Sequence, residues 1–190
     1  MKKLFFVYLL VFGQLALAGL TEDFHALKNT GRSHNATGTI CEEVTRLRYS
    51  EQYPEPEFRV LTGIAYSDNE RTIGELDLIV FDNSTHTAIL IGEVKCWKDP
   101  KGGLKKAMDQ RKRFLTNVKS SKALTFKWLD DPKEKFTKTQ FNKTNNFISI
   151  SQLGTKAKGF DVELEYTLQE LMQLRADIMA CQDSGECVKP

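Results

Sequence analysis

The chain has 190 residues, of which 41% are hydrophobic and 27% are charged. This length fits a single domain that is large enough to bury a proper core, and the lack of internal repeats excludes a solenoid or another repeat protein. The formal net charge of +2 excludes a strongly basic nucleic-acid-binding protein, so any such binding must come from local charge.

The N-terminus has the pattern of a secretory signal peptide. Residues 1–3 are a short basic start, residues 4–15 are mainly apolar, and Ala16-Leu17-Ala18 is an A-x-A cleavage site. An uncleaved anchor fits less well, because the apolar stretch is short, and no later segment is apolar enough to span a membrane. We therefore expect residues 1–18 to be removed and the mature chain to be exported, either to the periplasm or out of the cell.

The first third of the mature chain is predicted to hold two helices and one strand. Residues 21–28 fit a short helix, and residues 39–49 fit a longer amphipathic helix that Pro54 and Pro56 would end. Residues 58–67 have the composition of a strand.

Two strand-like runs follow, residues 74–82 and residues 88–96, with a short polar turn between them. Folding the two runs about Thr85 places Asp77 opposite Glu93. The sequence therefore predicts a hairpin that brings two carboxylates together.

Lys95 lies on the same face of its strand as Glu93, because alternate residues of a strand face opposite sides. The hairpin thus gathers two carboxylates and an ammonium, which are costly to bury unless they are paired or bind a metal. Asp77 and Glu93 offer the hard oxygen ligands that suit Mg²⁺, with Mn²⁺ as an alternative. Lys95 could orient or deprotonate a water, or stabilise negative charge during phosphodiester hydrolysis. The alternatives are a buried ion pair between Lys95 and one carboxylate, or charges at the solvent-facing ends of two strands.

A basic helix is predicted after the breaker at residues 99–103. Its apolar residues between Leu104 and Val118 recur at helical spacing. The segment from Lys98 to Lys122 contains nine basic residues and only two acidic ones. We expect five of these basic residues to contact nucleic-acid phosphates: Lys105, Lys106, Arg111, Lys112 and Arg113. The alternative is a solvated helix face, as most charge runs are.

The C-terminal part is predicted to contain two more strands and a helix. Residues 124–128 and 147–153 have strand character, and residues 133–146 between them are polar and are expected to be mobile. Thr167 and Glu170 form a capping-box signature that should open the last helix.

Four cysteines remain after the expected cleavage, and an even count in an exported protein predicts disulfides. Cys181 and Cys187 close a short loop that contains a glycine, so they are expected to pair. Cys41 and Cys96 then pair by elimination, with two buried free thiols as the alternative.

The segments Gly74-Glu75-Leu76-Asp77-Leu78-Ile79 and Gly92-Glu93-Val94-Lys95 resemble the PD-(D/E)XK nuclease superfamily, and most closely its Holliday-junction-resolvase-like and RecB-like branches. Leu76 replaces the proline that often precedes the Asp. The resemblance covers about residues 38–128, with a C-terminal elaboration over residues 129–190. It implies a restriction-endonuclease-like α/β/α sandwich on a central mixed β-sheet, and residues 19–190 are expected to form one such domain.

The resemblance also implies further site residues. These families often carry a glutamate on the first core helix that reaches the metal; Glu42 fits its spacing and Glu43 is the fallback, although both could be solvated first-turn acids. Gln110 and Phe114 stand where the RecB-like branch has a Q-x-x-x-Y element, with Phe in place of Tyr.

The function implied is an exported, Mg²⁺-dependent nuclease that hydrolyses phosphodiester bonds of DNA and leaves a 5′-phosphate and a 3′-hydroxyl. Asp77, Glu93 and Glu42 would bind the metal, Lys95 would assist the water, and Gln110 would position one of these groups or the substrate. RNA and a branched DNA junction are alternative substrates. A non-catalytic nucleic-acid-binding or protein-binding module on the same fold is the alternative function.

Overall fold

The computed structural model describes residues 19–68 and 71–190. Residues 19–27 are helical, and the helices that follow are α2 (Thr39–Gln52), α3 (Pro100–Lys119) and α4 (Leu168–Ser184), with the 3-10 turns η1 (Lys138–Gln140) and η2 (Lys156–Lys158). The strands are β1 (Phe58–Leu61), β2 (Ile64–Asp68), β3 (Arg71–Leu76), β4 (Leu78–Asp82), β5 (Thr87–Val94), β6 (Thr125–Trp128), β7 (Lys135–Phe136), β8 (Phe147–Ser151) and β9 (Val162–Glu163). The expected signal peptide lies outside the described residues. None of the helices described is both long enough and apolar enough to cross a membrane.

The chain folds as a mixed α/β protein around a five-stranded mixed sheet, as predicted. The strand order is β1-β4-β5-β8-β9. β1, β4 and β5 are antiparallel neighbours, whereas β8 runs parallel to β5 and β9 runs parallel to β8. β5 is therefore the central strand, and it carries Glu93 near its C-terminal end.

A second sheet is antiparallel throughout and has the order β3-β2-β6-β7. The predictions of single strands over residues 58–67 and 74–82 are wrong in one respect, because each run is broken and contributes to both sheets. Gly63, with a φ of 71°, stands between β1 and β2, and Asp77 stands between β3 and β4. The bend takes Asp77 out of the strand ladder at the junction of the two sheets.

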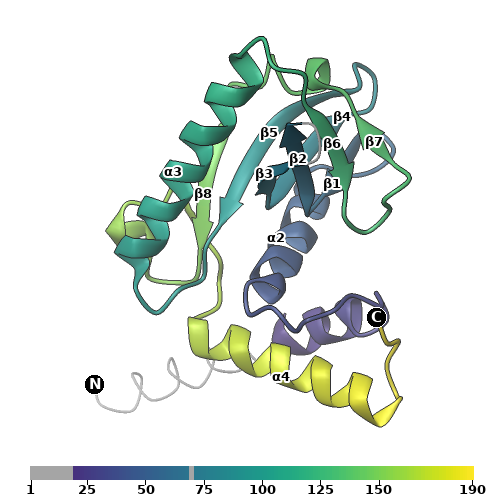
Figure 1. Cartoon of the computed structure of the whole chain (residues 1–190). Helices are drawn as coiled ribbons and strands as arrows, with labels where there is room; N and C mark the ends of the chain where they lie inside the picture. The colour runs from purple at the N-terminus through teal and green to yellow at the C-terminus, as the bar shows by residue number, and fades with distance from the viewer. Residues whose placement is uncertain (1–18, 69–70) are drawn as a thin grey trace. The chain divides into compact units, whose positions relative to one another are not determined.

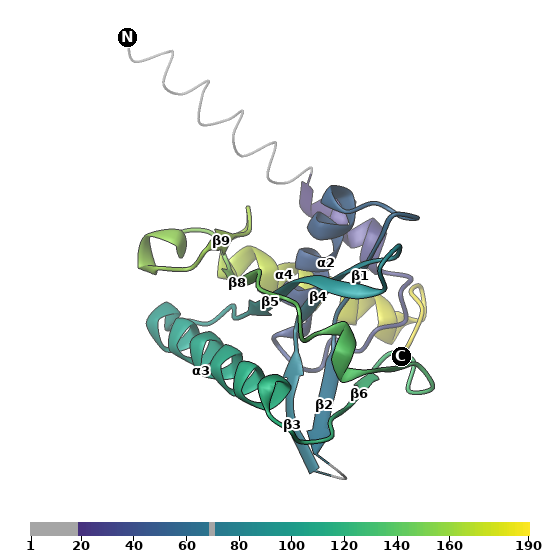
Figure 2. The same cartoon turned by 90° about the horizontal axis from the view of Figure 1, so that it is seen from above.

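An aromatic core fills the space between the second sheet, the five-stranded sheet and α3. Phe114 of α3 packs edge-to-face on Tyr66 of β2, with ring centroids 5.4 Å apart, and Phe81 of β4 joins the same buried cluster. α3 runs beside β5 and β8 (Figure 1). α2 lies on the other side of the five-stranded sheet (Figure 2).

The segment of residues 133–146, expected to be mobile, is packed. Phe136 and Phe141 are buried in the aromatic core, and the rings of Phe126 and Phe141 stack with centroids 4.3 Å apart. The two apolar rings outweigh the polar character of the residues around them. The strand predicted next is confirmed as β8, so residues beyond 128 contribute to the central sheet.

The chain divides into two compact units. Residues 19–40 form one unit with Glu165–Pro190, and the described residues of Cys41–Leu164 form the other, which holds both sheets. Within the first unit, α4 begins at the predicted capping box, and the predicted disulfide between Cys181 and Cys187 is present just after the helix ends.

Candidate active site

Asp77 and Glu93 face one another across the β4–β5 hairpin, as predicted. The ladder pairs Leu78 with Gly92, so the next step outward sets Asp77 opposite Glu93. The register shifts by one residue just after Val80. This β-bulge is what aligns the two carboxylates, because without it Asp77 would stand opposite Gly92.

Lys95 completes a buried cluster with these two carboxylates. Its Nζ atom donates a hydrogen bond to Asp77 Oδ2 in an ion pair, and it lies 3.6 Å from Glu93 Oε2. The Val94 N–H donates to Asp77 Oδ2 at 2.8 Å, whereas Glu93 Oε2 accepts no hydrogen bond from any described residue. All three charged side chains are buried. One ammonium is therefore shared between two carboxylates.

The protonation of the cluster follows from this arrangement. Burial, and then the charge of Asp77, raise the pKa of Glu93 to about 9. Burial alone would lower the pKa of Lys95, but the charges of Asp77 and Glu93 outweigh it, and the pKa of Lys95 is raised above its ordinary value. Lys95 therefore stays charged at neutral pH, and Glu93 carries a proton there unless a further cation compensates its charge.

The parallel strand β8 holds the backbone of Lys95 from the other side. The Lys95 N–H donates to the carbonyl of Ile150 at 3.0 Å, and Ser151 Oγ donates to the carbonyl of Lys95 at 2.8 Å. Gln152 Nε2 donates to the carbonyl of Trp97 at 2.8 Å. Sequence reasoning missed these positioning residues. Their signal was the pair of polar side chains at the end of an apolar strand.

The start of α2 is tied to the end of β5 by the predicted disulfide between Cys41 and Cys96, whose Cα atoms are 6.3 Å apart. Glu42 follows Cys41 directly, and Lys95 directly precedes Cys96. The charge of Glu42 contributes to the raised pKa of Lys95. Glu42 is therefore within electrostatic reach of the cluster.

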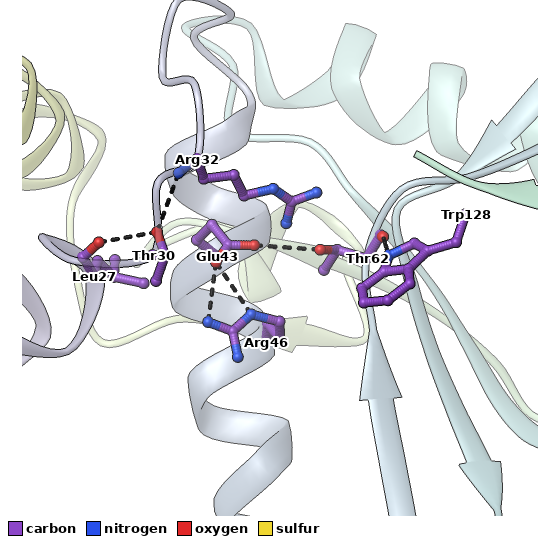
Figure 3. Close-up of polar contacts among 7 residues, drawn as sticks. All are labelled: Leu27, Thr30, Arg32, Glu43, Arg46, Thr62 and Trp128. Atoms are coloured by element: carbon purple, nitrogen blue, oxygen red, sulfur yellow. Dashed lines mark hydrogen bonds and ion pairs between the residues drawn. The ribbon is translucent and has the colours of Figure 1, made fainter. Parts of the chain in front are cut away.

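Glu43, the fallback to Glu42, has a different environment (Figure 3). It is buried, and its Oε2 atom accepts hydrogen bonds from both Nε and a terminal nitrogen of Arg46 at 3.0 Å. Its Oε1 atom accepts a hydrogen bond from Thr62 Oγ1 at 3.2 Å, and the Thr62 carbonyl in turn accepts one from Trp128 Nε1 at 2.9 Å. Glu43 thus joins α2 to the corner between β1 and β2, and both of its oxygens are used in doing so.

Gln110 lies on the inner side of α3, three residues after the buried Ala107 and four before the buried Phe114. Its Oε1 atom is buried and accepts no hydrogen bond from the described residues. The structure therefore leaves an acceptor on Gln110 available to a bound group, but it shows no hydrogen bond from that atom to the charged cluster.

The five basic residues expected to contact phosphates are all exposed on α3. They do not form one stripe: Lys105 and Lys112, seven residues apart, share one side of the helix, and Lys106 and Arg113 share another. Lys105 is paired with Asp109 at 2.7 Å. Two of them reach side chains of the sheets. The Arg111 guanidinium lies 5.0 Å from the ring centroid of Phe147, and Arg113 interacts with Tyr66 of β2, where it opposes the rise in the pKa of Tyr66 that burial causes.

The donor chemistry of the cluster fits a hard divalent cation. Asp77 and Glu93 present carboxylate oxygens, and Glu93 Oε2 is a buried acceptor that accepts no hydrogen bond from the described residues. Within residues 19–68 and 71–190, no three His, Cys, Asp or Glu side chains gather closely enough to hold a metal. The arrangement in place is thus two carboxylates with a lysine between them, and Glu42 nearby.

No protein-family model, curated protein or solved structure matches this chain. Any functional assignment therefore depends on the chemistry of the Asp77, Glu93 and Lys95 cluster and on the residues around it.

Proposed function

We propose that the mature chain is an exported, metal-dependent nuclease that hydrolyses phosphodiester bonds of DNA. The observation that supports this most is the buried cluster in which Asp77 and Glu93 share the single ammonium of Lys95. Without a further cation, Glu93 must either hold a proton at neutral pH or be buried as a carboxylate without a full partner, which costs about 3–5 kcal/mol. A protein that only binds a partner gains nothing from that cost. The resemblance of the same three residues to the PD-(D/E)XK superfamily points to the same chemistry.

Asp77 and Glu93 would hold Mg²⁺ or Mn²⁺, with Glu42 completing the ligand set. Such an ion, when bound, supplies Lewis-acid activation of a phosphate oxygen and lowers the pKa of a bound water. Its charge would also replace the proton on Glu93, so that both carboxylates of the cluster are ionised when the substrate arrives.

The chain's own residues supply position and charge. The N–H of Val94 and the ammonium of Lys95 fix Asp77 in its orientation. Lys95, which keeps its proton between two carboxylates, would stabilise the negative charge that develops on the phosphate oxygens. Because Lys95 keeps its proton, stabilising negative charge is favoured as its role over removing a proton from the water. Gln110 would donate or accept a hydrogen bond that places the water or the phosphate.

The reaction adds water across one phosphodiester bond. The water oxygen bonds to phosphorus, the bond from phosphorus to the 3′ oxygen breaks, and that oxygen takes a proton to become the 3′-hydroxyl. The exposed basic residues of α3 lie on the helix that covers the same sheet, so they would hold flanking phosphates. The two disulfides suit an oxidising compartment and support export.

The proposal is tested by the cleavage of labelled single-stranded DNA, duplex DNA and RNA in Mg²⁺. Asp77→Asn should lose at least about a hundredfold in rate, because it removes a charge that is needed in the transition state. Asp82→Asn, at the far end of the same hairpin, is the matched control and should cleave like the wild type. Cleavage by Asp77→Asn at the wild-type rate would show that the assignment is wrong.

A non-catalytic binding module is the second candidate. The direct ion pair between Lys95 and Asp77 favours it, because that contact could be purely structural. Nucleic-acid binding that needs no metal and survives replacement of Asp77, Glu93 and Lys95 together, with no cleavage of any of the three substrates, would support the module.

A further inference from the structure

A pocket of about 140 Å³ lies beside Glu93, on the face of the sheet that α3 covers. Its floor consists of two alternate rungs of the parallel β5–β8 pair, Ile91 beside Phe147 and Glu93 beside Ser149, with the Gly92–Ile148 rung between them. The facing wall is one stripe of α3 at helical spacing: Leu104, Ala107, Met108 and Arg111. Over this stretch the apolar side of the helix borders the pocket.

The walls are mainly apolar, and the polar side chains that line the pocket are Glu93, Arg111, Ser149 and Asp161. Asp161 Oδ2 accepts hydrogen bonds from the backbone N–H and the hydroxyl of Ser149, each at 2.8 Å. Glu93, only 4% exposed, lines it with a carboxylate whose Oε2 atom accepts no hydrogen bond from the described residues. Arg111 is exposed, and its guanidinium lies over the Phe147 ring, 5.0 Å from the ring centroid. No acidic side chain among the described residues pairs with Arg111. The pocket therefore joins an apolar slot to a guanidinium that forms no ion pair with a described residue, next to the proposed reaction centre.

We propose that this pocket is a subsite for one pyrimidine ring of a DNA strand, whose phosphate pairs with Arg111. The assignment rests on the proposed nuclease function. A protein cavity of about 150 Å³ holds one benzene ring, so a pocket of about 140 Å³ matches a single six-membered ring better than the larger fused rings of a purine. Phe147 and Met108, which line the pocket, would contact the ring, and Arg111 would bind the adjacent phosphate.

Occupancy of this subsite selects a form of substrate. A base inside the duplex is stacked and paired, so it must be unstacked before its ring can enter a slot between a helix and a sheet. Single strands and frayed ends present unstacked bases at much lower cost. The pocket thus predicts a preference for single-stranded DNA, or for the ends of duplexes, at the catalytic centre.

The test measures binding without cleavage, by calorimetry in EDTA. The probes are thymidine 5′-monophosphate, deoxyribose 5-phosphate, which lacks the base, and the ten-residue single strand dT10. Ala107→Leu extends an apolar side chain into the pocket, and Arg111→Met removes the rim charge but keeps an apolar stem. Ala176→Leu, an exposed position on α4, is the matched control.

We expect the wild type to bind thymidine 5′-monophosphate about tenfold or more tightly than deoxyribose 5-phosphate, since the ring supplies the contact. Ala107→Leu should lose this advantage, Arg111→Met should bind both probes more weakly, and Ala176→Leu should behave as the wild type. Saturation-transfer NMR on the wild type should show stronger transfer to the thymine methyl than to the sugar, a result that does not depend on any variant folding.

Three results would overturn the subsite: equal affinity for the two small probes, no transfer to the thymine methyl, or binding of the mononucleotide without binding of dT10. The proposed subsite and the proposed nuclease activity can be refuted independently of one another. DNA cleavage that is unchanged in Ala107→Leu, with no thymine contact, removes the subsite and leaves the nuclease. Thymine-dependent binding without cleavage of any nucleic acid leaves the subsite and removes the nuclease.

Discussion

Replacing Glu93 by Gln should change how the stability of the protein depends on pH. Glutamine reproduces the shape of a protonated carboxyl group but cannot ionise. In the wild type, burial and the charge of Asp77 raise the pKa of Glu93 from 4.5 to about 9, so the folded chain holds a proton that the unfolded chain releases. The stabilisation from this protonated form is therefore complete below about pH 4.5 and is lost as the pH rises toward 9.

The size of the effect follows from the width of that window. Each pH unit inside it changes the free energy of unfolding by about 1.4 kcal/mol. Between about pH 5 and about pH 8, the wild type should therefore lose at most about 4 kcal/mol relative to Glu93→Gln. The cost appears because Lys95, already paired with Asp77, cannot neutralise a second carboxylate.

The assay is urea unfolding in EDTA, followed by circular dichroism, at several pH values. The exposed Glu57→Gln variant is the control and should follow the wild type. In Mg²⁺ at about pH 8, the wild type should regain stability through binding to the ionised carboxylates, whereas Glu93→Gln should gain much less. Parallel curves for the wild type and Glu93→Gln over this pH range would refute the reasoning.

Three further predictions concern the residues around the cluster. Replacing both Cys41 and Cys96 by Ser should lower the free energy of unfolding by about 4 kcal/mol, because their disulfide closes a loop with a separation of 55 residues. Removing the disulfide between Cys181 and Cys187, with a separation of 6 residues, should cost only about 2 kcal/mol. Equal losses for the two disulfides in urea unfolding would contradict this. Glu43→Gln should cost about 2 kcal/mol, because Arg46 loses a buried charged partner, and a changed Mg²⁺ requirement for cleavage would show that Glu43 is a ligand. Lys112→Gln should weaken DNA binding and reduce the salt slope by about one; an unchanged slope in a salt titration would place Lys112 away from the phosphates.

The charged hairpin was predictable because it depends on alternation and on a short turn. The prediction took Thr85 as the centre of the turn, whereas the last ladder pair joins Asp82 to Thr87 and so places the centre half a residue earlier. The bulge after Val80 shifts the pairing by one residue, so that at the site the strands pair as folding about Thr85 predicts. The alternation of side chains carries no information on bulges, so the correct pairing at the site combined two deviations that cancel.

Other features depended on packing that a single sequence does not reveal. Nothing in the run around Asp77 marks the bend where the chain passes from one sheet to the other. Glu42 and Glu43 are equivalent as first-turn acids, and only the positions of Arg46 and Thr62 distinguish them. The stripe of α3 around Ala107 has the spacing of a core face, but the depth of the pocket beneath it depends on how β8 pairs with β5.

The most direct test of the central claim is the cleavage of supercoiled plasmid and linear DNA by the purified mature chain. The reactions are the wild type in Mg²⁺, the wild type in EDTA, and Lys95→Met in Mg²⁺. Cleavage that requires the metal ion and disappears with Lys95→Met is the expected result, and nicking of the plasmid would show internal cutting. Folded wild-type protein that leaves both DNA substrates intact, or Lys95→Met that cleaves them as fast as the wild type, would contradict the assignment.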